Sequence, residues 1–131
     1  MTGTPLAATS VVYAKDMARV AAFYQRTLGL AEREKEPGFI VLGSGAVEIS
    51  IVRIPETIAR SIDIATPPEP REDTPIKCSF LVDDLERVHA EAVAAGGGTR
   101  AIAEAWRWRG QLHLDGHDPE GNLVQFRQRG G

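Results

Sequence analysis

Two stretches of the chain, VVYAKDMARVAAFY at residues 11–24 and SFLVDDLERVHAEA at residues 79–92, follow one design. Each starts as an apolar strand, reaches an aspartate suited to cap a helix, and continues with the apolar spacing of an amphipathic helix. Asp16 and Asp84 mark the same point in the two copies, 68 residues apart. Because an internal repeat constrains the whole architecture, we expect two pseudo-equivalent halves.

The residues around each copy predict one order of elements, a strand and a helix followed by three strands. In the first half, Asp16 caps a helix that Gly29 ends, and the strands are expected at about residues 9–15, 32–35, 38–42 and 46–53. In the second half, a helix is expected at residues 84–95, and strands at 76–82 and near 99–103, 110–116 and 122–127. The fold class is therefore α+β, with two tandem βαβββ modules.

The stretch at residues 55–75 differs in composition, because it holds five prolines and the sequence TPPEPREDTP. Such a stretch is expected to run over the surface, with a short helical turn at about residues 58–62. It links half-modules at about residues 7–54 and 76–129. With 131 residues and 43% hydrophobic content, the chain fits a single domain.

Charge and cysteine content exclude several functions. The net charge of −3, without a basic patch, argues against nucleic acid or an anionic membrane as a partner. The segment MTGTPLAATS lacks the basic start and apolar run of a signal peptide, so a cytoplasmic location is expected. Cys78 stands alone, which permits no internal disulfide, and we expect it to be a small buried hydrophobe.

Four segments in this order, KDMARVAAFYQRTLGL, VEISIV, VDDLERVHAEAVAAGG and DPEGNLVQF, resemble the vicinal oxygen chelate superfamily. That superfamily includes glyoxalase I, extradiol dioxygenases, fosfomycin-modifying enzymes and bleomycin resistance proteins. The resemblance covers nearly the whole chain. It implies that each half forms a curled sheet, that the two sheets enclose a cup for a small organic molecule, and that the chain forms homodimers.

In metal-dependent members of this superfamily, the first and last strands of each half supply four ligands. The positions that match them here are occupied by Thr9, Glu48, Lys77 and Gln125. Only Glu48 is an ordinary ligand for a divalent transition ion, because an ammonium cannot donate a lone pair. No metal or other cofactor is therefore expected. Lys77 either replaces the ion opposite Glu48 or turns out to solvent.

The sequence HLDGH offers a second polar cluster. If Gln125 faces the cup, strand alternation places His113, Asp115 and His117 on one face of the preceding strand. His113 and Asp115 are then candidates for a base with its orienting carboxylate, for ligand hydrogen bonds, or for a displaced metal site. His113 and His117 lie roughly 13 Å apart along an extended strand, too far to share one ion. His117, beside the turn, is expected to be structural or exposed.

The segment WRWRG at residues 106–110 precedes this strand. Trp106 and Trp108, with Arg107 and Arg109, are expected to form a lid over a flat, aromatic or anionic ligand. The alternative is that one tryptophan packs in a dimer interface and the arginines stay solvated. Tyr13 faces the cup if Thr9 does, as a wall or as a hydrogen-bond donor. His89 lies among alanines and glutamates of a helix, so a surface position is expected.

Three functions remain open. The first is a metal-free binding protein for a small aromatic or cationic molecule, resembling bleomycin resistance proteins. The others are a glyoxalase- or dioxygenase-type enzyme with a nonstandard metal site and a metal-independent isomerase or lyase. The degraded ligand set favours the binding protein, and whether it is an enzyme is left open. If there is catalysis, Glu48 and His113 are the candidates for it. The candidate ligand-binding residues are Tyr13, Lys77, Trp106, Trp108, Asp115 and Gln125.

Overall fold

The computed structural model describes residues 3 and 6–130. The first half of the chain forms a four-stranded sheet with one long helix. Its elements are β1 (Ser10–Ala14), α1 (Met17–Leu28), β2 (Ala31–Glu36), β3 (Phe39–Ser44) and β4 (Val47–Arg53). The strand order is β1-β4-β3-β2, in which β1 runs parallel to β4 and the other neighbours are antiparallel.

The second half repeats this plan with additions. Its elements are β5 (Cys78–Val82), α3 (Leu85–Ala94), β6 (Gly98–Thr99), the 3-10 turn η1 (Ile102–Glu104), β7 (Trp106–Trp108), β8 (Gln111–His117) and β9 (Leu123–Arg129). The order is β5-β9-β8-β6, and β7 also pairs with β8. The α+β fold of two βαβββ-like modules is thus confirmed.

The two long helices begin where the sequence predicts. The carboxylate of Asp16 accepts the backbone N–H of Arg19, and that of Asp84 accepts the N–H of Glu86. These bonds satisfy donors that a helix start would otherwise leave unpaired. Gly29 ends α1 with a φ of 70°, which a residue without a Cβ adopts readily.

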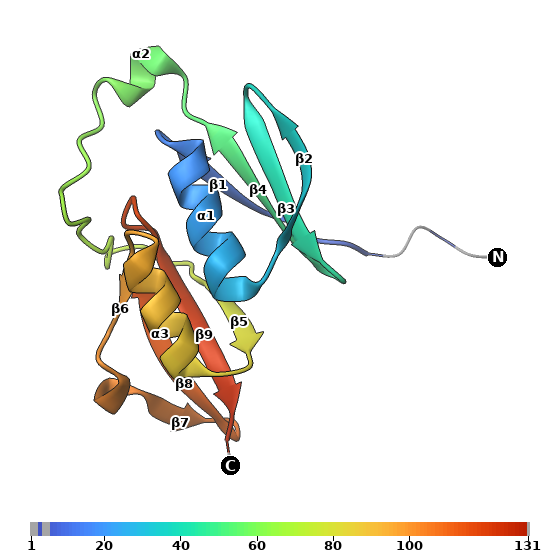
Figure 1. The fold of residues 1–131 in the computed structure, drawn as a ribbon, viewed down its shortest axis with the longest axis vertical. Helices are drawn as coiled ribbons and strands as arrows, with labels where there is room; N and C mark the ends of the chain where they lie inside the picture. Colours follow the sequence, from blue (N-terminus) through green and yellow to red (C-terminus); the bar gives the residue numbers. More distant parts are fainter. Residues whose placement is uncertain (1–2, 4–5, 131) are drawn as a thin grey trace.

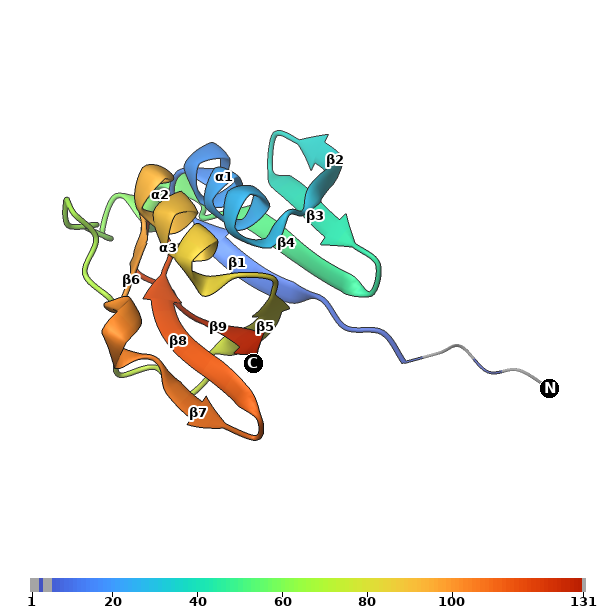
Figure 2. The same cartoon turned by 60° about the horizontal axis from the view of Figure 1, so that its bottom comes forward.

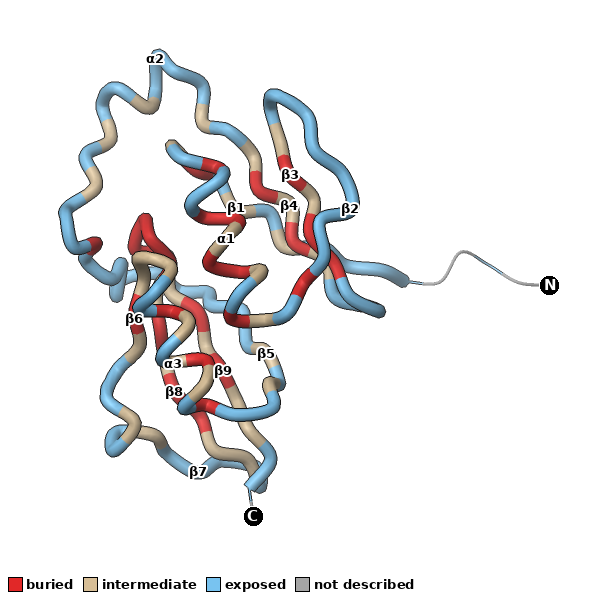
Figure 3. Tube along the Cα trace, in the orientation of Figure 1, coloured by how far each residue is buried: buried red, intermediate tan, exposed pale blue. Residues whose placement is uncertain are grey.

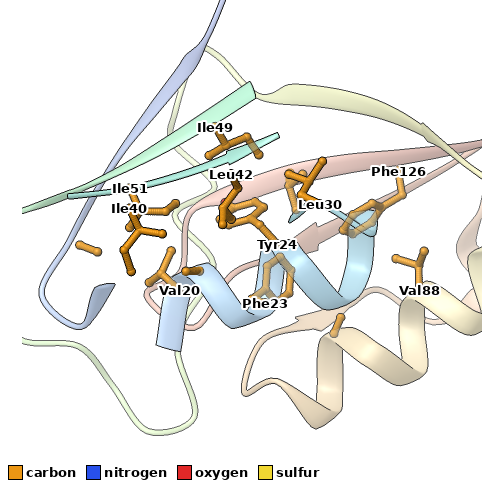
Figure 4. Packing of buried hydrophobic residues seen from close by; sticks show 14 of the residues in the cluster. Val20, Phe23, Tyr24, Leu30, Ile40, Leu42, Ile49, Ile51, Val88 and Phe126 are labelled. Carbon is orange, nitrogen blue, oxygen red and sulfur yellow. The ribbon is translucent and has the colours of Figure 1, made fainter. Parts of the chain in front are cut away.

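The helices α1 and α3 lie side by side and cover the same side of the two sheets (Figures 1 and 2). The core sits between them and the strands. Figure 4 shows Val20, Phe23 and Tyr24 of α1 packed toward isoleucines of β3 and β4 and toward Phe126 of β9. Phe23 and Phe126 are fully buried with ring centroids 6.5 Å apart. Each such ring contributes about 1.5–3 kcal/mol by leaving water, so α1 joins both halves.

A carboxylate also ties the halves together. Glu120, in the turn between β8 and β9, accepts the backbone N–H groups of Lys15 and Asp16 at 2.9 and 2.8 Å. In the same turn, the buried Asp118 accepts the hydroxyl of Tyr24 at 2.8 Å. The sequence DPEG, expected only as a turn, therefore anchors the second half to both ends of the β1–α1 connection.

The linker runs over the surface, as Figure 3 shows by its mostly exposed trace. Its helical turn is α2 (Glu56–Ala59), slightly earlier than the expected residues 58–62. The strand expected near residues 99–103 is short, because the chain turns into η1 after Thr99. The segment at residues 106–110, for which no strand was expected, contains β7. Among the described residues, no helix is long and apolar enough to span a membrane.

The expectation that Cys78 is a buried hydrophobe is wrong, because the side chain is exposed. It lies at the first position of β5, where the strand has no neighbour on one edge.

Candidate functional site

Each sheet has one face turned away from its helix, and we call this the cup face. On β8 and β9, Leu114, Val124 and Phe126 are buried against α3, so the alternating side chains point to the cup face. In the second half they include Lys77, Ser79, Gln111, His113, Asp115, Gln125 and Arg127. The prediction that His113 and Asp115 share a face with Gln125 agrees with this pairing, in which Asp115 lies opposite Gln125.

A row of side-chain hydrogen bonds crosses this face over three strands. Lys77 Nζ donates to Asp115 Oδ2 at 2.8 Å, and Gln125 Nε2 approaches Asp115 Oδ1 at 3.5 Å. The hydroxyl of Ser79 donates to Gln125 Oε1 at 2.7 Å. These bonds fix the orientation of the Ser79 hydroxyl and the Gln125 amide. Asp115 only accepts, so the chain of donors ends at its carboxylate.

The other end of the row is an arginine. Arg127 Nε donates to the Ser79 hydroxyl at 2.9 Å, and its Nη1 donates to Gln111 Oε1 at 3.1 Å. With Lys77 at one end, Asp115 within and Arg127 at the other end, the row carries two positive charges and one negative charge. We call these six side chains the polar row: Lys77, Ser79, Gln111, Asp115, Gln125 and Arg127.

His113 lies beneath the two tryptophans of β7. Its side chain is only 2% exposed, and its ring stacks on Trp106 with centroids 5.6 Å apart and an interplanar angle of 22°. Trp108 also contacts it at 5.6 Å, and that indole is 59% exposed. The two indoles thus cover His113 and present an aromatic surface to solvent, with Arg109 above the Trp108 ring at 5.5 Å.

The hydrogen bond of His113 fixes its tautomer. Nδ1 lies 3.0 Å from the backbone oxygen of Gln111. Because a carbonyl oxygen only accepts, Nδ1 carries the proton, and Nε2 keeps the lone pair in the neutral ring. The expectation that Asp115 orients His113 is wrong, since the carboxylate of Asp115 is held by Lys77 and Gln125 instead.

Part of this face is hollowed into a cavity of about 380 Å³. It is lined by Ser79, Trp108, Arg109, Gln111, His113, Gln125 and Arg127. Two of these side chains are arginines and none is a carboxylate. We call it the indole cavity.

The cup face of the first half carries the candidates Glu48, Thr9 and Tyr13. Glu48 lies near Arg33 Nη1 at 3.8 Å, with both side chains about 40% exposed. The hydroxyl of Thr9 contacts Ser50 Oγ at 3.5 Å and donates to the backbone oxygen of Glu48. Tyr13 is 61% exposed on the same face. The hypothesis that Lys77 pairs with Glu48 is wrong, because each has another partner.

Strand register changes one assignment. Val11 pairs with Ser50 on β4, and Ser79 pairs with Gln125 on β9. Since Val11 and Ser79 occupy equivalent positions of the repeat, Ser50 is the structural counterpart of Gln125, and Glu48 lies two residues before it. The match was missed because the sequence VEISIV places both residues on one face, and only strand pairing distinguishes them.

Sequence reasoning also missed Ser79 and Arg127, which alternate with Lys77 and Gln125 along their strands. The period-two rule that located Asp115 would have identified both of them. His89 lies outside the cup face, where its Nδ1 contacts the Thr99 hydroxyl at 2.6 Å.

The metal positions of the resemblance do not fit a divalent ion. Three of these positions, Thr9, Ser50 and Gln125, offer only neutral oxygens as ligands. The fourth is Lys77, whose ammonium cannot bind a metal ion and is hydrogen-bonded to the carboxylate of Asp115. Across the described residues, no three His, Cys, Asp or Glu side chains gather as metal ligands.

Comparison with known proteins gives the same architecture. The family model described as a glyoxalase-like domain matches residues 9–126. No curated protein matches the chain. Many solved structures do, at low sequence identity.

One is a glyoxalase/bleomycin resistance protein/dioxygenase family enzyme from Burkholderia phytofirmans, with 20% identity, a TM-score of 0.68, and coverage of 92% of this chain and 95% of that one. Another is the bleomycin resistance determinant encoded on the transposon Tn5, with 20% identity, a TM-score of 0.62, and coverage of 95% and 98%.

A third is a bleomycin-binding protein from Streptomyces verticillus, complexed with copper(II)-bleomycin, with 19% identity, a TM-score of 0.60, and coverage of 99% and 100%. Together with the repeated modules, the family match over residues 9–126 shows that this chain belongs to the glyoxalase-like domain family, within the vicinal oxygen chelate superfamily.

Proposed function

We propose that the protein binds a small organic ligand in its cup without the metal ion of its metal-dependent relatives. The observation that carries the proposal is the polar row, which places the ammonium of Lys77, already paired with Asp115, at a former ligand position. Two solved neighbours are bleomycin-binding proteins complexed with that drug or its copper form, so the binding of an organic ligand has a precedent in this fold.

The indole cavity favours an aromatic ligand with an anionic or acceptor group. Trp108 supplies an exposed indole face, and an aromatic ring stacked on another contributes about 0.5–1.5 kcal/mol beyond its burial. Arg109 and Arg127 line the same cavity, and no carboxylate does. A planar carboxylate suits an arginine better than a lysine, because the guanidinium can form two parallel hydrogen bonds.

The test is calorimetric titration with 2-naphthoate and with bleomycin, before and after treatment with a chelator. We expect 2-naphthoate to bind with an affinity that the chelator leaves unchanged. Trp108→Ala and Arg127→Gln should each weaken it about tenfold, whereas Arg129→Gln, on the same strand but outside the cavity, should not. Affinity that disappears with the chelator, or that Arg127→Gln leaves unchanged, would refute the proposal.

Homodimerisation is part of the proposal. Val11, Tyr13 and Leu81 are 41–61% exposed on the cup faces, and apolar surface of this kind is commonly covered by a second copy. Sedimentation of the chain at two concentrations tests it, and a strictly monomeric species would restrict the ligand site to one chain.

A metal-independent isomerase is the second candidate, and the tautomer of His113 favours it. With Nδ1–H donating to the backbone oxygen of Gln111, the lone pair of this tautomer lies on Nε2, the atom from which an imidazole accepts a proton. Chelator-treated protein offered the hemithioacetal of methylglyoxal and glutathione tests this. Turnover that His113→Gln abolishes supports the isomerase, turnover that needs added metal supports a nonstandard metal enzyme, and no turnover supports binding alone.

A further inference from the structure

We propose that the protein has a second ligand site, between the two halves and beneath the linker, that takes an amphipathic carboxylate with an aliphatic body. A cavity of about 580 Å³ lies there, within the range of 300–1,000 Å³ usual for small-molecule sites. It is a different hollow from the indole cavity, since the two share no lining residue. We call it the linker cavity.

Much of the lining of the linker cavity comes from three parts of the chain. β1 contributes Val12 and Tyr13, and β5 with the residue before it contributes Lys77, Cys78 and Phe80. The third wall is the linker itself. Because β1 and β5 belong to different sheets and are not paired as strands, side chains make the wall between them.

The linker turns an aliphatic side toward this space. Ile54, Ile58 and Ile62 recur every four residues around α2 and all line the cavity, whereas Glu56 and Arg60 do not. Ile58 lies within α2, and Ile54 and Ile62 flank it. Because all three line the same cavity, they form a single apolar stripe along it. Ile58 is still 54% exposed, so the stripe is not filled by the protein's own side chains.

The linker is fastened at both ends of the cavity. The ammonium of Lys15 donates to the backbone oxygen of Ile62, and the backbone N–H of Arg71 donates to the oxygen of Gly121 at 2.8 Å. Gly121 has a φ of 87°, and a Cβ there would collide with the backbone oxygen of Glu69. The cavity is therefore a built feature whose roof is held against the turn between β8 and β9.

Charge identifies the class of ligand. The charged residues that line the linker cavity are Arg71 and Lys77, and no Asp or Glu lines it. Lys77 is already paired with Asp115, which leaves Arg71 as the cation for a ligand. An aliphatic body against the isoleucine stripe and a carboxylate at Arg71 match this lining, because charge-assisted hydrogen bonds are the stronger class.

Octanoate is the probe, compared by calorimetry with octanol and octyltrimethylammonium. We expect octanoate to bind about tenfold more tightly than octanol, and the cation not to bind. Arg71→Gln should remove the preference for octanoate while leaving octanol binding unchanged. Arg60→Gln, an exposed linker arginine outside the cavity, should change neither affinity.

The thiol of Cys78 can show whether octanoate binds in the linker cavity. Cys78 is the only cysteine in the sequence, is exposed and lines this cavity. Saturating octanoate should slow alkylation of its thiol by iodoacetamide, and Arg71→Gln should shift this protection to about tenfold higher octanoate. Trp108→Ala should leave the protection unchanged, which separates this site from the indole cavity. Equal affinities for octanoate and octanol, an unaffected Arg71→Gln variant, or unprotected Cys78 would each overturn the proposal.

Discussion

Ser10 and Cys78 occupy the same position in the two halves and touch one another, with Ser10 Oγ and Cys78 Sγ 3.3 Å apart. They are 68 residues apart, the spacing that also separates Asp16 from Asp84. Because equivalent residues meet only near the symmetry axis that relates them, the pseudo-two-fold axis of the molecule passes between β1 and β5. The indole cavity lies on the second half, and the linker cavity lies beside the axis.

The ion pair of Lys77 and Asp115 should contribute little to the stability of the fold. Their side chains are 36% and 23% exposed, so solvent screens the pair. Lys77→Met should change the free energy of unfolding by less than about 1 kcal/mol in urea denaturation, and Lys35→Met serves as an exposed control. A loss of several kcal/mol would instead mean that the pair is a buried element of stability.

Tyr24 should make the fold sensitive to alkali. Burial, followed by the nearby charge of Asp118 and the hydrogen bond to it, raises the pKa of this hydroxyl well above 10.0. A raised folded-state pKa contributes stability that is complete below the unfolded value of about 10 and is lost as the pH rises through the folded pKa.

Denaturant unfolding at pH 8 and above pH 10 measures this loss. Tyr24→Phe should be less stable than the native chain at pH 8, because Asp118 loses a donor, but should lack this part of the alkaline decline. Tyr13→Phe, at an exposed tyrosine, should behave like the native chain. An alkaline decline of the same size in Tyr24→Phe would contradict the assignment.

His117 should make the stability of the fold fall at acidic pH. Burial lowers the pKa of this imidazole below 6.5, partly offset by the charge of Asp118. The unfolded chain therefore binds the proton first, and stability falls as the pH drops from about 6.5 through the folded pKa. His117→Gln should flatten the plot of unfolding free energy against pH in this window, and an unchanged slope would show that other groups control it.

Substitution of Gly116 tests how closely β8 packs against its neighbours. A Cβ there would lie 2.8 Å from the backbone oxygen of Gly98 and 2.9 Å from Phe126 Cε2. Gly116→Ala should therefore cost about 1–3 kcal/mol of unfolding free energy. Gly38→Ala, whose Cβ would meet nothing within 4 Å, should cost less than about 0.5 kcal/mol. Thermal melting of the two variants compares them, and equal midpoints would contradict the close contact.

The sequence predicted the architecture well because the repeat, the capping aspartates and the apolar periodicity act locally. Asp16, Asp84 and Gly29 begin or end their helices as expected. Alternation likewise placed His113 and Asp115 on the face of Gln125.

The pairing of side chains was less predictable, because it depends on contacts across strands. Lys77 finds Asp115 rather than Glu48, and Ser50 rather than Glu48 matches Gln125, since register is set by the whole sheet. The exposure of Cys78 depends on how the two halves meet, which no local pattern reports. The strand β7 was missed because WRW is short and its partner β8 follows directly after a turn.

The cup is proposed to bind its ligand without a metal ion, and the metal content of the protein is the first quantity to measure. Tag-free protein is stripped with a chelator, exposed in turn to manganese, iron, nickel and zinc, desalted, and measured by mass spectrometry. We expect no ion to be retained in stoichiometric amount, since the positions of Thr9, Ser50, Lys77 and Gln125 offer no anionic ligand. One tightly held ion per chain that Glu48→Ala releases would contradict it.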